Sequence, residues 1–154
     1  MSVVSEIMSQ RPVVTVNIND NPSALHVAKL MAKYRIGSVV VVQRNDDNNN
    51  NRKPVGIITE RDIIKKVSAQ NKNPDQVAAS LIMSSPLAVV KSIDSIDTAA
   101  ETMAKNNIKR LVVLEQDGSM IGILSTSDIA KKLAKIVIED YRRYRSLRNI
   151  LDMD

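Results

Sequence analysis

The sequence predicts an α+β fold made of two copies of one small unit, each with the element order β-α-β-β-α. The main observation is an internal repeat, because residues 56–63 (GIITERDI) return 66 positions later as residues 122–129 (GILSTSDI). Upstream segments match in the same order: residues 7–9 with 82–84, and residues 39–42 with 111–114. A unit of about 60 residues is marginal alone, so each copy should stabilise the other. We therefore expect packing about a pseudo-twofold axis, in which a cleft built by one copy has a twin.

The first half of each unit reads as a strand followed by a helix. Strand-like apolar runs come first: residues 13–16 after Pro12, and residues 87–90 after Pro86. Apolar residues then recur at the spacing of a helix face: Ala24, Val27, Ala28 and Met31 in the first copy, Ile96, Ala99, Ala100 and Met103 in the second. Ser23 in the first copy, and Ser95 or Asp97 in the second, suit the helix start.

The second half of each unit reads as a hairpin followed by a helix. In the second copy the hairpin strands are residues 110–115 and 120–125, joined by a turn at Asp117 and Gly118. In the first copy the polar residues 44–53 open the same hairpin, and we expect this loop to be mobile. The apolar runs are continuous, which predicts strands covered on both faces.

The closing helices complete the predicted organisation. One begins at Thr59 and runs towards Gln70, and the other begins at Ser125 and is expected to continue to about Asn149. The predicted boundaries are residues 1–70 for the first repeat, 71–80 for a linker, 81–133 for the second repeat and 134–154 for a basic helical C-terminal tail.

Composition excludes several classes of function. The chain has no Phe, no Trp and three Tyr among 154 residues, so it lacks the aromatic platforms that bind single-stranded nucleic acid. It has no Cys, which excludes disulfides and thiolate metal sites, and its one histidine, His26, cannot form a multi-histidine metal site within one chain. We interpret His26 as a structural or surface residue. No base–nucleophile pair is evident, so we expect no enzyme activity and no metal or resident cofactor.

The sequence also gives an expectation for location. No window approaches the roughly 18 apolar residues that a membrane span needs. The N-terminus lacks the basic start and apolar core of a signal peptide. We therefore expect a cytoplasmic protein with no membrane partner.

The duplicated pattern resembles a tandem pair of CBS domains, often called a Bateman module. The resemblance covers roughly residues 3–133 and rests on five features found in both copies: the Ile-Met of residues 7–8 and 82–83, the strand after proline, the Ala/Met helix, a strand such as residues 109–113, and the closing Gly-x-x-Thr/Ser-x-x-Asp-Ile motif. It implies a regulatory module whose two clefts bind AMP, ADP or ATP, or sometimes S-adenosylmethionine. It also implies a disc-like homodimer, and a regulated protein that the sequence does not identify.

The closing motif has chemistry that suits such a ligand. A carboxylate accepts hydrogen bonds from both hydroxyls of a ribose, which suits Asp62 and Asp128 to hold the sugar. Thr59 and Ser125 lie three residues earlier and can reach a sugar or phosphate oxygen, and the helix start favours phosphate. Apolar neighbours offer a wall for a purine: Ile57 in the first copy and Ile123 in the second.

The same spacing has a second interpretation that needs no ligand. Thr59 with Asp62, and Ser125 with Asp128, also match a capping box, in which a hydroxyl and an acidic side chain satisfy the free backbone groups of a helix start. Both roles can coexist in one motif.

The family resemblance places cations near the phosphate. In this sequence these are Lys109 at the start of a central strand with Arg110 beside it, and Arg61 just before Asp62, where the second copy has Ser127. Each of these side chains could instead be a solvated surface group. The first copy has Gly37 and Ser38 in place of the lysine and arginine.

These departures predict clefts of unequal affinity, in an order that the sequence leaves open. We expect the Asp62 cleft to take its cation from Arg61, and the Asp128 cleft to combine Lys109 with two hydroxyls. The resemblance also suggests that each cleft is lined by the leading segment of the opposite repeat: Val3 and Met8 in one case, Ala78 and Met83 in the other.

The C-terminal tail supports two alternatives. Residues 129–154 hold seven basic and four acidic residues, and so carry +3 of the net charge of +5. An approximate apolar stripe predicts a helix that packs on its own domain or on a dimer mate. The arginines suggest instead a basic surface for nucleic acid or an acidic partner: Arg142, Arg143, Arg145 and Arg148. Three hypotheses follow: a nucleotide-sensing module, a nucleic-acid-binding regulator, and a dimeric scaffold with vestigial pockets.

Overall fold

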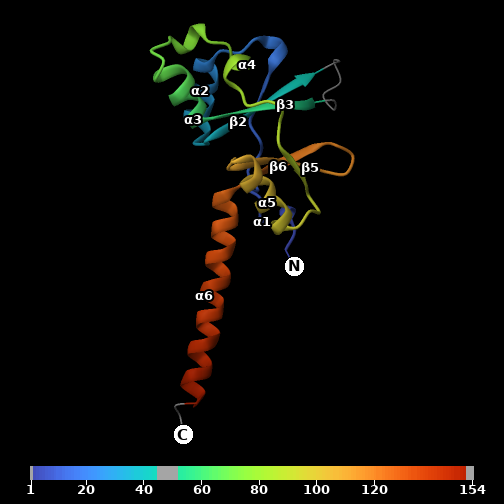
Figure 1. Ribbon diagram of the computed structural model, residues 1–154, viewed down its shortest axis with the longest axis vertical. Helices are drawn as coiled ribbons and strands as arrows, with labels where there is room; N and C mark the ends of the chain where they lie inside the picture. Colours follow the sequence, from blue (N-terminus) through green and yellow to red (C-terminus); the bar gives the residue numbers. More distant parts are fainter. Residues whose placement is uncertain (1, 45–51, 152–154) are drawn as a thin grey trace.

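A computed structural model of the protein describes residues 2–44 and 52–151. It contains two three-stranded sheets with the same topology (Figure 1). The first sheet consists of β1 (Thr15–Asn17), β2 (Ser38–Arg44) and β3 (Arg52–Thr59), and the second of β4 (Val89–Lys91), β5 (Arg110–Leu114) and β6 (Met120–Ser125). In each sheet the short first strand pairs parallel to the central strand, which pairs antiparallel to the third. The α+β class and the duplication are confirmed.

Each unit carries one amphipathic helix on the outer face of its sheet. These helices are α2 (Ala24–Tyr34) and α5 (Ile96–Asn106). The Ser23 and Ser95 side chains accept the first backbone hydrogen bonds and cap the helices, as the sequence predicts. The buried positions fall on the expected faces: Ala24, Val27 and Met31 in α2, and Ala99 and Met103 in α5. His26 is exposed on the far side of α2.

The two closing helices differ greatly in length. The first is α3 (Glu60–Ile63), which continues as the π-helical turn η2 (Ile64–Ser68). The second, α6 (Thr126–Leu151), is a single helix of 26 residues. Two short 3-10 turns, η1 (Ile18–Asp20) and η3 (Pro74–Gln76), complete the connections.

The second hairpin follows the prediction, but in the first hairpin Arg44, Arg52 and Lys53, which were expected in the loop, are paired residues of β2 and β3. Gly118 adopts a left-handed conformation with φ of 86° between β5 and β6. Ser119 donates both its hydroxyl and its backbone N–H to Asp117, and these hydrogen bonds lower the pKa of the Asp117 carboxyl. The mobile loop expected in the first hairpin falls mainly on residues 45–51, which lie outside the described residues.

The leading segments are exchanged between the units. The first, α1 (Val4–Ile7), joins the core of the second unit, where Val4 is fully buried and its N–H bonds to the Asp94 carbonyl at 2.9 Å. The other, α4 (Ala79–Ile82), joins the core of the first unit. Each core is therefore completed by a segment that precedes the opposite repeat in the chain, which ties the two units together.

Two glycines of the closing motif make room for this exchange. A Cβ atom on Gly56 would lie 2.6 Å from the Met83 sulfur, and one on Gly122 would lie 2.8 Å from the Met8 sulfur. Both distances are too short for real atoms. The glycines therefore let the methionines of the leading segments pack directly against the sheets.

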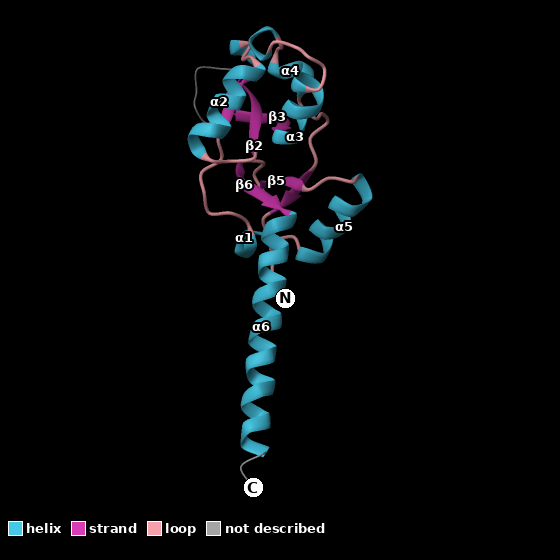
Figure 2. Ribbon diagram, turned by 90° about the vertical axis from the view of Figure 1, so that its left-hand side faces the viewer, coloured by secondary structure: helices cyan, strands magenta, loops and turns pink. Residues whose placement is uncertain are grey.

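The sheets face each other across a shared apolar layer, with helices outside (Figure 2). Val40, Val42 and Val112 are fully buried in this layer. Along β2, four consecutive valines (Val39, Val40, Val41 and Val42) have no exposed area, as the prediction of strands covered on both faces requires.

Beyond its first two turns, α6 leaves the body and extends away from it (Figures 1 and 2). Ile129 still packs on the second core, but every residue from Leu133 to Leu151 is exposed. The expectation that the tail packs on its own domain is therefore wrong for this part of the chain.

Candidate ligand-binding clefts

Two cavities lie at related positions between the units. The Asp62 cleft has a volume of about 440 Å³ and the Asp128 cleft about 460 Å³. Each is lined by the closing motif of one unit together with the first-strand segment and the turn before the central strand of the other unit. For the Asp62 cleft the principal residues are Ile57, Thr59, Arg61, Asp62, Ser84, Leu87, Ala88, Lys109 and Arg110. For the Asp128 cleft they are Ser9, Arg11, Val13, Val14, Arg35, Arg110, Ile123, Ser125, Ser127, Asp128 and Lys131.

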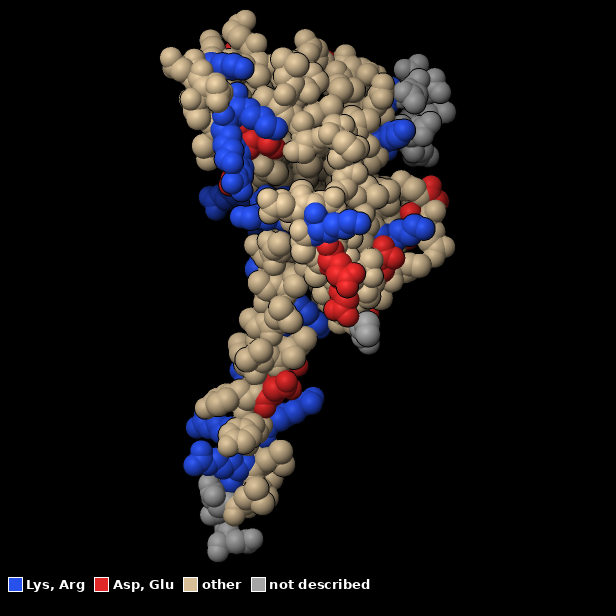
Figure 3. Space-filling view, in the orientation of Figure 1, with Lys and Arg blue, Asp and Glu red and all other residues tan. Residues whose placement is uncertain are grey.

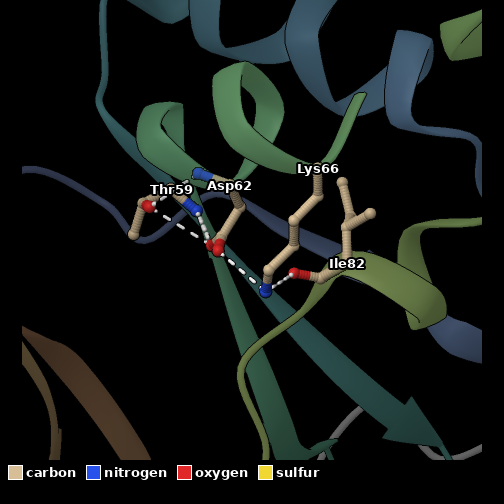
Figure 4. Close-up of polar contacts among 4 residues, drawn as sticks. All are labelled: Thr59, Asp62, Lys66 and Ile82. Atoms are coloured by element: carbon tan, nitrogen blue, oxygen red, sulfur yellow. Dashed lines mark hydrogen bonds and ion pairs between the residues drawn. The ribbon is translucent and has the colours of Figure 1, made fainter. Parts of the chain in front are cut away.

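A capping box forms around Asp62. The Thr59 N–H donates to the Oδ2 atom of Asp62 at 2.9 Å, and the Asp62 N–H donates to the Thr59 hydroxyl at 3.4 Å. The other carboxylate oxygen, Oδ1, lies 3.0 Å from the Nζ atom of Lys66, which also donates to the Ile82 carbonyl at 2.9 Å (Figure 4). Only 12% of the Asp62 side chain is exposed. Both of its oxygens therefore have a partner within the protein.

A similar capping box forms around Asp128. The Ser125 N–H donates to the Oδ2 atom of Asp128 at 2.8 Å, and the Asp128 N–H donates to the Ser125 hydroxyl at 3.2 Å. Lys132 occupies the position that corresponds to Lys66, but within residues 2–44 and 52–151 no basic group forms an ion pair with Asp128. Its second oxygen therefore remains available at the wall of the cleft.

The two interpretations of the motif describe the same atoms. Both capping boxes form, and both carboxylates also line a cavity between the units. The capping bonds use one oxygen of each carboxylate and fix its orientation. Helix capping and ligand contact are thus compatible in this fold.

The structure corrects the expected distribution of cations. Lys109 lies in the Asp62 cleft, together with Arg61, and does not line the Asp128 cleft. Its carbonyl accepts the Thr126 N–H at 3.0 Å, so its backbone is held by the closing helix of its own unit. The turn nevertheless faces the opposite unit, because each cleft is assembled across the pseudo-twofold axis.

The cations of the Asp128 cleft come from positions that the motif does not mark. Arg35 ends α2 in a left-handed conformation, Arg11 precedes the first strand, and Lys131 follows Asp128 by one helical turn. The α-helical spacing of three residues between Asp128 and Lys131 is the one signal that could have indicated Lys131 from the sequence. Ser125 and Ser127 line this cleft, as expected.

Arg110 lines both clefts. Its side chain passes over Gly37, where an added Cβ atom would lie 2.7 Å from the Nη2 atom of Arg110. The space left by glycine in the first copy is therefore filled by a guanidinium from the second copy. The absence of a basic residue at Gly37 and Ser38 does not leave this region without positive charge.

The leading segments do not line the clefts as expected. Met8 and Met83 lie against Gly122 and Gly56, while Val3 and Ala78 form isolated bridges with Ser95 and Ser23. The lining residues follow these segments in the chain instead. Ser84 and Ile57 exchange two backbone hydrogen bonds, of 2.9 and 3.3 Å, which fix the wall of the Asp62 cleft. Ile57 and Ile123 line their clefts, as the sequence predicts.

Comparisons with known proteins identify the architecture. The sequence profile described as "CBS domain" matches residues 4–69 and 78–135, well over half of the chain. The chain belongs to the CBS domain family. An uncharacterised protein from Methanopyrus kandleri is 38% identical over 107 residues, which cover 70% of this chain and 52% of the relative. The chain thus spans about half the length of that relative.

Solved CBS structures are also similar. A CBS domain protein from Pyrobaculum aerophilum, complexed with AMP, is 34% identical with a TM-score of 0.70, over 82% of this chain and 89% of that one. A CBS domain pair in complex with 5′-methylthioadenosine and S-adenosyl-L-methionine is 28% identical with a TM-score of 0.70, over 87% of this chain and 97% of that one.

The described part of the chain holds no cluster of three or more His, Cys, Asp or Glu side chains suited to a metal ion. Among the described helices, none combines the length and the apolar character that a membrane span requires.

Proposed function

We propose that this CBS domain pair is a regulatory module that binds an adenosine nucleotide, AMP, ADP or ATP, in the clefts between its two units. The observation that carries the proposal is the Asp128 carboxylate. It is fixed by a capping bond through one oxygen, its other oxygen has no ion-pair partner in the described chain, and the residue lines a cavity that is also lined by cations. A carboxylate held in this way is preorganised to accept hydrogen bonds from a ribose diol.

The surroundings of Asp128 supply the other parts of a nucleotide site. Ile123 and Val13 offer apolar surface for a purine. Four basic side chains line the same cavity and suit a phosphate chain: Arg11, Arg35, Arg110 and Lys131. The volume of about 460 Å³ falls within the usual range of small-molecule sites, which is about 300–1,000 Å³.

The Asp62 cleft supports weaker binding on the same principles. The Oδ1 atom of Asp62 is paired with Lys66, so a ribose must displace or share that ion pair. Three cations line the cleft, Arg61, Lys109 and Arg110, but the acidic Glu60 lines it as well. We therefore infer that the Asp128 cleft has the higher affinity.

Structures of relatives add support for the ligand class. The protein from Pyrobaculum aerophilum is complexed with AMP, and the other CBS pair with 5′-methylthioadenosine and S-adenosyl-L-methionine. All three ligands contain adenosine. A regulatory role in the cytoplasm, through a protein that responds to the occupied state, completes the proposal and leaves no catalytic step to this chain.

Thermal unfolding with AMP, ADP, ATP and S-adenosylmethionine tests the function. A ligand at about 100 times its dissociation constant should add roughly 2.7 kcal/mol to the free energy of unfolding. The double variant Asp62→Asn, Asp128→Asn should lose this stabilisation. Asp97→Asn is the matched control, since Asp97 is also a first-turn carboxylate but lines neither cleft.

The outcomes separate the proposal from its alternatives. If none of the four compounds stabilises the protein, or if the double variant responds like the wild type, nucleotide binding in these clefts is refuted. A dimer that responds to no nucleotide would favour a scaffold with vestigial pockets.

A further inference from the structure

The outer part of α6 has an apolar surface that nothing in the described chain covers. Its large apolar side chains are 43–76% exposed from Leu133 to Leu151. This segment is about 28 Å long at 1.5 Å per residue. Most helical stability in proteins comes from tertiary packing of an amphipathic face. The exposed apolar side chains therefore indicate that a partner covers this segment.

The apolar residues follow the heptad spacing of a helix–helix contact. Alternating steps of four and three residues connect the positions of one stripe: Leu133, Val137, Asp140, Tyr144, Leu147 and Leu151. Further apolar side chains flank the stripe at Ile136, Tyr141 and Ile150. Lys135 and Arg142 lie on the opposite side of the helix, by the same periodicity. In the view of Figure 3, uncharged surface runs along the helix, with basic groups and one acidic patch at its margins.

The order of side chains in the stripe is nearly symmetric about its centre. Around a centre at residue 142, the apolar Leu133 corresponds to Leu151, and Val137 corresponds to Leu147. Its one polar position, Asp140, corresponds to Tyr144, whose hydroxyl can donate to a carboxylate. A second copy of the same helix in antiparallel orientation therefore matches every position of the stripe.

Charge distinguishes this orientation from the parallel one. The acidic Glu139 and Asp140 precede the centre, and the basic Arg143 and Arg145 follow it. Antiparallel pairing places the acidic residues of one helix opposite the segment 143–145 of the other. Parallel pairing in register would place Asp140 against Asp140 in an apolar seam, which is unfavourable.

We propose that the apolar stripe of α6 binds the α6 helix of a second copy of this chain, antiparallel and centred on residue 142. The two CBS bodies then lie at opposite ends of a shared helical pair. This contact involves no residue that lines either cleft, so it does not depend on the nucleotide proposal.

Sedimentation of the full chain tests the contact. The variant Val137→Glu, Leu147→Glu should raise the dissociation constant of the assembly by about 100-fold or more, because it buries unpaired charge in the seam. Ile138→Glu is the matched control: Ile138 is 52% exposed but lies off the stripe, and this variant should assemble like the wild type. A cooperative thermal unfolding transition like that of the wild type shows in each case that the bodies are folded.

Cross-linking tests the orientation, and the absence of native cysteine makes it simple. A mixture of the Val137→Cys and Leu147→Cys chains should form disulfides between unlike chains. Like residues would lie about 15 Å apart, too far for a disulfide bond. Disulfides between like chains would overturn the antiparallel arrangement. A monomeric wild type, with or without nucleic-acid binding by its arginines, or an unchanged mass for the double glutamate variant, would overturn the contact.

Discussion

The Asp62 and Asp128 clefts carry the same motif in different electrostatic states. In both, a hydroxyl and a carboxylate cap the closing helix with similar hydrogen bonds. In one, Lys66 neutralises the remaining carboxylate oxygen, whereas in the other that oxygen has no ion-pair partner among the described residues. The comparison shows that a duplicated motif can preserve its structural role in both copies while its availability to a ligand diverges.

The two clefts also share one basic residue. Arg110 lines both, while the corresponding residue of the first repeat, Ser38, lies only in the Asp128 cleft. The pseudo-twofold symmetry is therefore broken at one guanidinium. Changes to that residue should act on both sites, and changes to its neighbours on one.

Among substitutions of the basic residues around the clefts, Arg110→Ser, which restores the residue of the first repeat, should have the largest effect. Loss of one charge-assisted hydrogen bond to phosphate should weaken nucleotide binding by about tenfold at each cleft. Calorimetric titration in the Asp62→Asn and Asp128→Asn backgrounds measures each cleft separately. Lys109→Ala is the control and should weaken the Asp62 cleft alone. If nucleotide affinity at one cleft is unchanged by Arg110→Ser, the guanidinium does not contribute to both sites.

A smaller effect should follow from Lys66→Gln, which makes the two clefts more alike. The substitution removes the ion pair of the Asp62 Oδ1 atom, so that oxygen becomes available to the ribose. Because Lys66 is 44% exposed, its ion pair is screened, and we expect a gain of about threefold in affinity at the Asp62 cleft. The matched variant Lys132→Gln should change neither cleft. Weaker binding in Lys66→Gln would mean that the lysine itself contacts the ligand.

The sequence predicts the elements of this protein well because the repeat supplies each pattern twice. The capping serines Ser23 and Ser95, and the valine run of β2, have local causes that lie in adjacent residues. Thr59 and Ser125 were also placed correctly at the helix starts that border the clefts. These features depend on spacing along one segment.

The assembly of each cleft could not be predicted in the same way. Lys109 belongs to the same repeat as the Asp128 motif, yet it lines the Asp62 cleft. Arg11 and Arg35 belong to no motif and meet Asp128 only because the units face each other. The direction of α6 could not be predicted either, because an amphipathic pattern does not show whether the surface that covers its apolar face belongs to the same chain.

We infer that Asp128 forms the stronger nucleotide site because its second oxygen has no ion-pair partner in the described chain. Calorimetric titration of the wild type, Asp62→Asn and Asp128→Asn with the nucleotide that stabilises the protein most tests it directly. We expect two unequal sites in the wild type, retention of the tighter one in Asp62→Asn, and its loss in Asp128→Asn. Loss of the tighter site in Asp62→Asn, with no effect of Asp128→Asn on it, would show that Asp128 does not form the stronger site.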